Sequence, residues 1–375
     1  MRKIQMVDLH SQYIRLKNEI DTAIQTVLDS ANFVKGPETE KFQQELSKYL
    51  NCSHVIACAN GTDALQIAMM SLGLKPGDEV ITPTFTFIAT VETIALLGLK
   101  PVLVDVDPDT FLINIDEVRK KISENTKAII PVHLFGQCAD LENLELLAKS
   151  NNIHIIEDNA QALGSDFIFK NSDRRKSGTI GTIGCTSFFP SKNLGCYGDG
   201  GALITNNDEI AKRILAIANH GMIKKYHHEY IGINSRLDAI QAAILRVKLK
   251  YLDEFCEKRR NAADFYDERL KHIEGIRVPK RVNNSTHVFH QYTIVLEKYN
   301  RDEFADYLNN KGIPAMVYYP VPLHLQNAYK YLGYKYGDFP VAEELANKVI
   351  SLPMHTELDE EQLNYIANTI YEYVK

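Results

Sequence analysis

Lys192 lies in the stretch of this chain whose residue types best suit chemistry. Phe188, Phe189 and Pro190 precede it, and four glycines follow within the next nine residues. A lysine at the edge of an apolar pocket is desolvated, which lowers the pKa of its amine and makes the amine a nucleophile. The segment therefore indicates a Schiff-base lysine. The alternative is a solvated lysine in a glycine-rich turn, and this segment alone does not decide between the two.

A second candidate, Asp158, directly follows an apolar strand predicted at 153–157. Active sites of parallel sheets lie at this end of the strands, and a buried carboxylate there needs a partner or a proton. A cationic pyridinium nitrogen would be suitable, because the carboxylate would keep it protonated and make the ring an electron sink. The alternative is a helix cap.

A phosphate site is indicated where a strand at 54–58 turns into a helix. The backbone amides of Gly61 and Thr62 at the helix N-terminus would favour a phosphate, and the Thr62 hydroxyl adds a donor. Thr62 and Asp63 are also ordinary capping residues, so helix capping is the alternative. Phe85, which follows the next strand, either stacks on a planar ring or belongs to the core.

Signals for other chemistries are missing from the sequence. No Gly-x-Gly-x-x-Gly follows the first strand and no Gly-x-x-x-x-Gly-Lys-Ser/Thr occurs. The sequence therefore lacks the main motifs of dinucleotide-binding and P-loop sites. The pair His227-His228 lacks the His-Glu-x-x-His spacing and reads as a solvated loop, and we predict no metal site. Cys196 lies close to Lys192 and is either reactive or a small packing residue.

The elements that would position these residues alternate between strands and helices. Two amphipathic helices come first, at 8–29 and around Phe42, Leu46 and Leu50. The alternation that follows has strands at 54–58, 79–82, 101–106, 128–132 and 153–157, and helices at 64–72, 88–97, 115–122 and 141–149. This order predicts an α/β fold with a mostly parallel sheet covered by helices on both faces.

The C-terminal third has a different pattern. A strand at 202–205 and a helix at 208–219 lead to a long helical stretch at 237–270, followed by strands at 288–295 and 315–319 and helices at 302–310, 342–350 and 360–373. We therefore predict a large domain, residues 1–250, and a smaller C-terminal α+β domain, residues 251–375, with the boundary inside the long helix.

Composition excludes several classes of protein. A chain of 375 residues with 45% hydrophobic and 24% charged residues can bury a large core, and a net charge of -6 leaves no basic footprint for nucleic acid. Neither a leader peptide nor an apolar run of bilayer length is recognisable, so we expect no membrane partner. Six scattered cysteines without a Cys-x-x-Cys pair fit reduced thiols in a cytoplasm.

Several motifs together resemble one known family. In order they are Asn60-Gly61-Thr62-Asp63-Ala64-Leu65, Glu157-Asp158 with Gln161-Ala162, Ser187-Phe188-Phe189 with Lys192-Asn193-Leu194, Gly198-Asp199-Gly200-Gly201, Asn219-His220-Gly221, Asn234-Ser235-Arg236-Leu237-Asp238 and Ser351-Leu352-Pro353-Met354-His355. They resemble the DegT-type sugar-nucleotide aminotransferases, pyridoxal-phosphate enzymes with the aspartate aminotransferase fold (fold type I). The resemblance extends from Asp8 to about Leu358.

The resemblance implies a role for each matching residue. Lys192 would form the Schiff base with pyridoxal 5'-phosphate and move a proton during transamination. Asp158 would pair with the pyridinium nitrogen, and Gln161 would contact the cofactor ring and its oxygen. The other implied contacts are ring stacking by Phe85, a phosphate cradle of Gly61, Thr62 and Ser187, and a phosphate ligand, Asn234, from a second subunit. The family pattern thus implies a homodimer with two shared sites.

The segment from Ser187 to Gly201, with Lys225-Tyr226-His227-His228, is most similar to one subgroup. Those enzymes aminate C3 of a UDP-linked 2-acetamido-3-keto-hexuluronic acid with L-glutamate as donor, for surface-polysaccharide precursors. Tyr318-Tyr319-Pro320 departs from the usual His-Tyr-Pro, and Asn159 stands where Ala or Cys is common. Another keto sugar nucleotide, a pyridoxal-phosphate dehydratase and a non-catalytic regulatory homologue are the alternatives. Dehydrating members of the family carry histidine in place of the lysine, so Lys192 argues against that branch.

The carboxylates of such substrates call for a cation. No arginine follows Arg301, so residues 302–375 cannot supply the bidentate fork by which many fold type I aminotransferases hold an α-carboxylate. We predict that Arg236 of the partner subunit binds both substrate carboxylates in alternate half-reactions; local pairing with Asp238 is the alternative. The predicted substrate-binding residues are Arg236, Tyr318, Tyr319 and His324.

Overall fold

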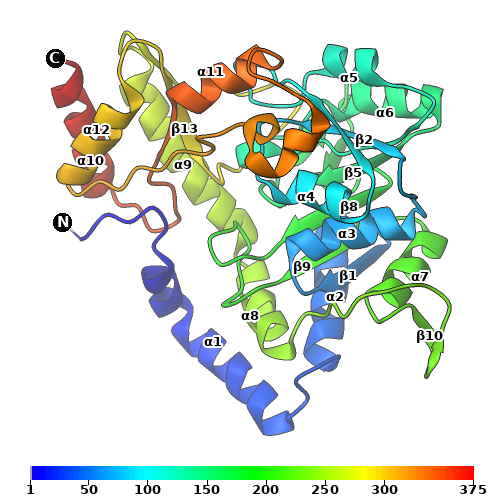
Figure 1. The fold of residues 1–375 in the computed structure, drawn as a ribbon. Helices are drawn as coiled ribbons and strands as arrows, with labels where there is room; N and C mark the ends of the chain where they lie inside the picture. The colour runs from blue at the N-terminus through cyan, green and yellow to red at the C-terminus, as the bar shows by residue number, and fades with distance from the viewer. Residues whose placement is uncertain (1) are drawn as a thin grey trace.

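The computed structural model describes residues 2–375 and is built around a central sheet of seven strands (Figure 1). The strand order is β1-β9-β8-β5-β4-β2-β3. Their bounds are β1 (His54–Cys58), β2 (Glu79–Pro83), β3 (Lys100–Val104), β4 (Thr126–Ile129), β5 (His154–Asp158), β8 (Ile183–Ser187) and β9 (Gly201–Thr205). β9 runs antiparallel to both of its neighbours, whereas β8, β5, β4, β2 and β3 pair in parallel. The prediction of a mostly parallel sheet is confirmed.

Helices cover both faces of this sheet because its strands are apolar on both sides. Ile155 and Ile156 of β5 point to opposite faces, as successive strand residues must. Ile156 packs on the face covered by α3 (Gly61–Ser71), α4 (Ala89–Leu96) and α7 (Asp208–Ile217). Ile155 packs on the face covered by α5 (Ile115–Lys121) and α6 (Leu141–Asn151).

The first two helices pack along a later helix, and the second also contacts the edge strand β1. α1 (Leu9–Ser30) begins at Asp8, whose side chain accepts from the Ser11 amide, and lies along α8 (Ala239–Leu249) at the lower edge of Figure 1. α2 (Pro37–Leu50) starts after Gly36 and packs between β1 and α8. Both helices agree with the apolar spacing in the sequence.

The long helix predicted at 237–270 is two helices. α8 ends at Leu249 and α9 (Leu252–Leu270) begins three residues later, after a turn in which the Tyr251 amide donates to the Lys248 carbonyl at 3.0 Å. Neither glycine nor proline marks this break, so local sequence gave no sign of it. The predicted boundary between residues 250 and 251 falls at the break, and the two-domain division remains a prediction.

The C-terminal part has its own antiparallel sheet of β12 (Ile276–Arg277), β13 (Tyr292–Leu296) and β14 (Val349–Leu352). Helices α9, α10 (Arg301–Asn310) and α12 (Glu360–Val374) pack with it around one apolar core at the upper left of Figure 1. α11 (Pro340–Lys348) packs on another core, which includes Leu103 of β3, Val295 of β13 and Val349 of β14.

Three predictions for this part were wrong in extent. The strand expected at 288–295 begins only at Tyr292, and residues 315–319 make one bridge, Met316 to Ser351, rather than a strand. The helix expected at 342–350 ends at Lys348, because Val349–Leu352 pairs with β13. The sequence analysis missed β8 and the hairpins β6 (Asp166–Ile168) with β7 (Arg174–Lys176) and β10 (Met222–Lys224) with β11 (His227–His228).

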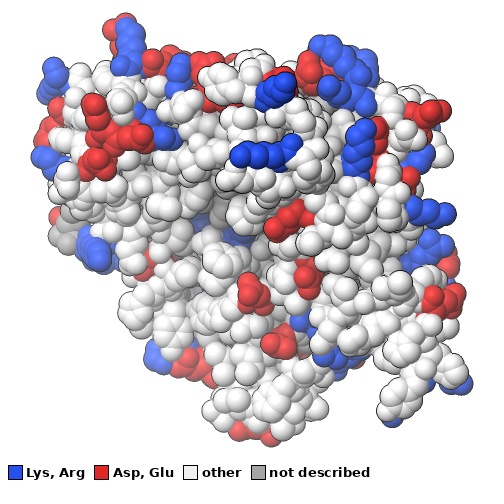
Figure 2. Space-filling view, in the orientation of Figure 1, with Lys and Arg blue, Asp and Glu red and all other residues white. Residues whose placement is uncertain are grey.

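Charges of both signs are interspersed on the face shown in Figure 2, without a large field of one sign. None of the helices within residues 2–375 is long and apolar enough to cross a membrane.

Candidate active site

A cavity of about 540 Å³ lies at the carboxyl ends of the central strands. This is where parallel sheets gather their ligands. Of the site residues predicted from the sequence, the structure brings eight together in its walls: Gly61, Thr62, Asp158, Gln161, Ser187, Lys192, Tyr318 and Tyr319. The cavity walls do not include the other four, Phe85, Asn234, Arg236 and His324.

Lys192 stands in the turn that follows β8, where its amide donates to the Phe189 carbonyl at 2.8 Å. Burial lowers the pKa of Lys192 to about 8, and the nearby negative charge of Asp158 acts in the opposite direction. In a fraction of the molecules the Lys192 amine is therefore unprotonated near neutral pH, as a nucleophile or a base requires. The solvated-turn alternative does not describe this lysine.

Asp158 ends β5 and is buried. The Thr90 hydroxyl donates to Oδ2 at 2.8 Å, and the Ala160 amide donates to Oδ1 at 3.2 Å. Burial raises the pKa of the carboxyl, and the Thr90 hydrogen bond opposes this shift. Residues 160–164 are turns, so no helix begins here for Asp158 to cap.

The carboxylate of the preceding residue, Glu157, is held by groups of the protein itself. It is fully buried, and its carboxylate accepts from the amides of Gly178, Ile180 and Gly181 at 2.6–2.7 Å. His133 Nε2 completes the set at 2.9 Å, and because His133 Nδ1 accepts from the Ala139 amide, Nε2 carries the proton. Glu157 thus fixes the 178–181 loop, whereas Asp158 faces the cavity.

The N-terminus of α3 supplies the predicted anion site. Asn60 is the helix cap, with Oδ1 accepting from the Asp63 amide at 2.7 Å, so the Thr62 hydroxyl is not used for capping. A Cβ on Gly61 would lie 2.7 Å from the Cβ of Ser187, which no real contact allows. Only glycine lets the helix approach the end of β8 this closely, at the point where Gly61 and Thr62 line the cavity.

The two phenylalanines after β2 have different positions. Phe85 is only 1% exposed and packs edge-to-face on Tyr319 and at a tilt on Phe111, so the prediction that it stacks in the site is corrected: it is a core residue. Phe87 is 54% exposed, lines the cavity and lies 6.2 Å from the Tyr319 ring. Phe87, which the sequence analysis overlooked, is an aromatic side chain of the cavity wall that is available to a planar ring, as is Phe189, which is 53% exposed.

The side chains of Gln161 and Tyr319 are joined by a hydrogen bond. Gln161 Oε1 accepts from the Phe135 amide at 2.7 Å, and Nε2 donates to the Tyr319 hydroxyl at 3.2 Å. The Tyr319 hydroxyl therefore keeps its own proton for a ligand. Burial raises the pKa of both Tyr318 and Tyr319, so both phenols stay neutral.

His324 does not reach the cavity, and its prediction as a substrate contact is corrected. Its Nδ1 pairs with the Thr84 hydroxyl and its Nε2 with Glu343 Oε1, both at 2.9 Å, and the ring is buried against Phe339. Nδ1 joins the C-terminal part to the end of β2 and Nε2 is held by Glu343 of α11, so no donor remains for a substrate.

Asn234 and Arg236 lie outside this chain's own cavity. Asn234 is exposed and pairs with Asn219 in a short bridge, and Arg236 lines a separate groove beside Lys35. Burial lowers the pKa of Lys35, and the positive charge of Arg236 adds to that shift. Among residues 2–375 Arg236 forms no ion pair, so the alternative of local pairing with Asp238 is not observed.

Charged side chains in the cavity wall are few. Among the described residues, Lys192 is the only Lys or Arg in it, and Asp158 and Asp199 are its acidic residues. Within residues 2–375 no cluster of His, Cys, Asp and Glu is arranged to hold a metal ion, and His227 and His228 are exposed on a hairpin.

These features fit pyridoxal 5'-phosphate. A buried carboxylate without a cationic partner in contact with it suits a protonated ring nitrogen, and the glycine-lined helix end suits a phosphate. When bound, the cofactor supplies the electron sink that allows a proton to leave a carbon bearing nitrogen. Lys192 would accept and return that proton, Asp158 would hold positive charge at the ring nitrogen, and Phe87 would offer an aromatic face to the ring.

Such a lysine and carboxylate at the strand ends of a mostly parallel sheet define a pyridoxal-phosphate-dependent enzyme. The chain belongs to the DegT/DnrJ/EryC1/StrS aminotransferase family, whose model matches residues 15–371. It is therefore an aminotransferase of this family with pyridoxal 5'-phosphate as cofactor.

Three relatives cover nearly the whole chain. A protein of Geobacillus stearothermophilus named "Pleiotropic regulatory protein" is 46% identical, with 99% of both chains covered. The UDP-2-acetamido-2-deoxy-3-oxo-D-glucuronate aminotransferase of Pseudomonas aeruginosa is 45% identical, with 97% of this chain and 98% of the relative covered. The UDP-N-acetyl-3-dehydro-alpha-D-glucosamine 3-aminotransferase of Acidithiobacillus ferrooxidans is 42% identical, with 98% and 97% covered.

Two solved structures are similar in fold. The S. venezuelae protein DesV, in complex with a ketimine intermediate, superimposes with a TM-score of 0.95 at 38% identity, over 100% of this chain and 99% of that one. The protein NtdA of Bacillus subtilis, with bound cofactor PMP, gives a TM-score of 0.90 at 30% identity, over 100% of this chain and 86% of that one.

Proposed function

We propose that this enzyme transfers the amino group of L-glutamate to C3 of a UDP-linked 2-acetamido-2-deoxy-3-keto-hexuluronic acid. Two relatives at 45% and 42% identity are named for amination of UDP sugars that carry a 3-oxo or 3-dehydro group. They differ in that one substrate is a uronate and the other is not. Position C3 and a UDP carrier are thus supported by both names, and the uronate by one.

The observation that carries the proposal of a shared active site is the shortage of positive charge in the cavity. Glutamate, the uronate and the cofactor phosphate are all anions, yet Lys192 is the only Lys or Arg in the wall. Arg236 is an arginine without an ion pair, and it lies outside the cavity of its own chain. We infer that Arg236 of the partner subunit binds the substrate carboxylates and that Asn234 of the partner subunit binds the phosphate.

A homodimer is the assembly that such sharing requires. The β10–β11 hairpin protrudes from the body of the chain at the lower right of Figure 1. This hairpin and the segment after it expose the side chains of Ile223, Tyr226 and Ile231. Apolar side chains gathered in this way are typical of an interaction site. This surface supports a second copy of the chain as the partner. We further propose that the enzyme works in the cytoplasm on precursors of surface polysaccharides, including lipopolysaccharide O-antigen.

The experiment is an amino-transfer assay with glutamate and a panel of keto sugar nucleotides. We expect the UDP-3-keto-uronate to give the highest kcat/KM, with one glutamate consumed for each amino sugar formed. Equal or faster turnover of the UDP-3-keto sugar without the carboxylate would refute the uronate and leave amination at C3. Conversion of the sugar without consumption of an amino acid would indicate a dehydratase.

A substrate like that of the A. ferrooxidans relative is the second candidate. Tyr318 stands where the resembling subgroup usually has histidine, so the cavity presents a neutral phenol at that position. A neutral group there favours a sugar without a carboxylate. The same panel separates the two candidates.

A further inference from the structure

His290 is a cavity residue without a role in the chemistry described so far. It lies just ahead of β13, lines the cavity beside Gln291, and is 5% exposed. Its Nδ1 is buried and has no hydrogen-bond partner among the described residues. Because His290 contributes to the cavity wall, its other ring nitrogen, Nε2, is the one open to a ligand.

The backbone around His290 is fixed from three sides. Asn193, the residue after Lys192, donates from Nδ2 to the Val288 carbonyl at 3.0 Å, and the Val288 amide donates to the Gly136 carbonyl at 2.9 Å. Arg259 Nη1 donates to the Phe289 carbonyl at 3.1 Å and to the Met354 carbonyl at 2.9 Å. The position of His290 relative to Lys192 is therefore set by the fold.

Gly136 makes this close packing possible. It has φ 110°, and a Cβ there would lie 2.9 Å from the Phe289 amide nitrogen and 3.0 Å from that of His290. Only glycine adopts this conformation without strain and leaves room for the segment. A loop that only connected two elements would not need to be packed this tightly.

The imidazole of His290 is neutral. Burial lowers its pKa well below the ordinary value, and the positive charges of Lys192 and Arg259 act in the same direction. A neutral imidazole has one N–H and one acceptor nitrogen. Buried N–H groups without an acceptor are rarer than unpaired acceptors, so we assign the proton to Nε2.

We propose that His290 is a substrate-binding residue that donates a hydrogen bond from Nε2 to an oxygen of the sugar. His290, Gln291, Tyr318 and Tyr319 form a wall of neutral hydrogen-bonding groups. Such a wall suits the hydroxyl, keto and acetamido oxygens of a sugar, whereas a carboxylate favours an arginine. The proposal rests on the proposed function in that it requires a sugar substrate.

A pair of substitutions tests which nitrogen acts. In His290→Gln the side-chain amide can reach the place of Nε2, whereas in His290→Asn it reaches only the place of Nδ1. We expect His290→Asn to lower kcat/KM for the keto sugar by about tenfold, the size of one lost hydrogen bond, and His290→Gln to stay within about threefold of the parent. The glutamate half-reaction and the cofactor absorbance should be unchanged in both variants.

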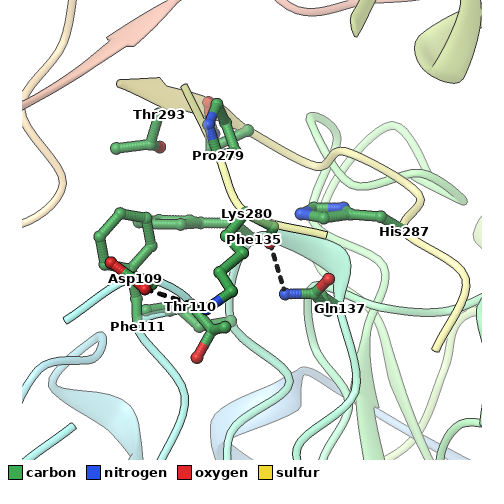
Figure 3. A pocket seen from close by; sticks show the side chains of 11 residues that line it. Asp109, Thr110, Phe111, Phe135, Gln137, Pro279, Lys280, His287 and Thr293 are labelled. Atoms are coloured by element: carbon green, nitrogen blue, oxygen red, sulfur yellow. Dashed lines mark hydrogen bonds and ion pairs between the residues drawn. The ribbon is translucent and has the colours of Figure 1, made fainter. Parts of the chain in front are cut away.

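His287→Asn is the matched control. His287 stacks on Phe289 in the same segment, its Nδ1 accepts from the Phe289 amide at 3.0 Å, and Asn can retain this acceptor. Its side chain lines a separate cavity of about 10 Å³, where Lys280 pairs with Asp109 (Figure 3). We expect this variant to keep the parental kcat/KM for the sugar.

Three readouts keep the test decisive. Melting temperature and cofactor absorbance report on folding, and calorimetric binding of UDP-N-acetylglucosamine reports on the sugar contact without turnover. Equal losses in the Asn and Gln variants, or a loss confined to the glutamate half-reaction, would overturn the role of His290. A parent that binds the nucleotide sugar but aminates no keto sugar would refute the proposed function, and the binding comparison would still decide on His290.

Discussion

Replacing Thr90 with valine removes the side-chain hydrogen bond that the buried Asp158 receives within residues 2–375. Thr90 Oγ1 lies 2.8 Å from Asp158 Oδ2 and Thr90 is completely buried, so water cannot take the place of the hydroxyl. Valine has nearly the same shape as threonine. The change therefore deletes a donor to a carboxylate and leaves the packing of α4 in place.

The size of the effect follows from the charge of the acceptor. A hydrogen bond to a charged group contributes about 1.5 to 3 kcal/mol. Because about 1.4 kcal/mol corresponds to a factor of ten in affinity, the loss in cofactor affinity should lie between roughly tenfold and a hundredfold. The pKa of Asp158 is already raised by burial, and losing the Thr90 donor raises it further. The carboxyl must lose its proton to hold a cationic ring nitrogen, so the affinity loss should grow as the pH falls.

The assay is titration of pyridoxal 5'-phosphate into cofactor-free protein, followed by absorbance, at mildly acidic and at alkaline pH. Thr90→Ser keeps the hydroxyl and loses only a methyl group, so it serves as the control and should bind as the parent does. Melting curves of both variants show whether the fold is intact. If Thr90→Val binds the cofactor as tightly as Thr90→Ser at both pH values, the reasoning about Asp158 is wrong.

Four further predictions concern other residues. Phe87→Ala should weaken cofactor binding by about three- to tenfold, the worth of one aromatic contact, whereas Phe85→Leu should lower the melting temperature and spare cofactor affinity. In cofactor-free protein the reactivity of Lys192 towards an amine-directed reagent should rise up to about pH 8 and then level off, because its pKa is about 8; a rise that continues to the ordinary lysine range would contradict this. Mixing Lys192→Ala chains with Asn234→Ala chains should restore activity, since one of the two sites in the mixed dimer is intact. The substitution Arg236→Lys should slow both half-reactions. Failure to restore activity after proven subunit exchange would exclude shared sites, and a glutamate half-reaction at the parental rate in Arg236→Lys would assign the carboxylate to another residue.

Parts of the site could be predicted because their chemistry leaves a mark in the local sequence. Asp158 follows an apolar strand, and Lys192 follows aromatic residues and precedes glycines. Those patterns favour a place in the site for both residues, although the segment of Lys192 alone left a solvated turn open and the strand β8 before it was not predicted. Gly61 was predictable for the same reason, since a strand followed by a glycine-containing helix start is a local feature.

Other parts depend on contacts between distant segments. Phe85 and Phe87 differ by two positions, but β2 ends at Pro83, so strand alternation no longer tells which ring faces the core. The orientation of His290 depends on Gly136, Asn193 and Arg259, none of which is near it in sequence. Motif reading had no signal for His290, because a histidine ahead of a strand is common.

The break between α8 and α9 and the antiparallel β9 were also out of reach. No helix-breaking residue stands at Lys250 or Tyr251, and helical periodicity continues across them, so tertiary packing alone ends α8. Likewise, a short apolar strand such as β9 carries no record of its direction. Only its pairing with β1 on one side and β8 on the other determines that.

The hydrogen bond from Asn193 to Val288 also bears on how the molecule moves. It joins the C-terminal part directly to the segment of Lys192, and it is not alone: the Leu323 amide donates to the Thr84 carbonyl at 2.9 Å, and the Ala342 amide donates to Asp105 Oδ1 at 2.9 Å. A hinge that opened the cavity would break all three bonds together. We therefore expect the chain to stay one rigid body during catalysis, with a cavity whose shape is set before the substrates bind. Reorganisation of the cavity should then cost little binding energy.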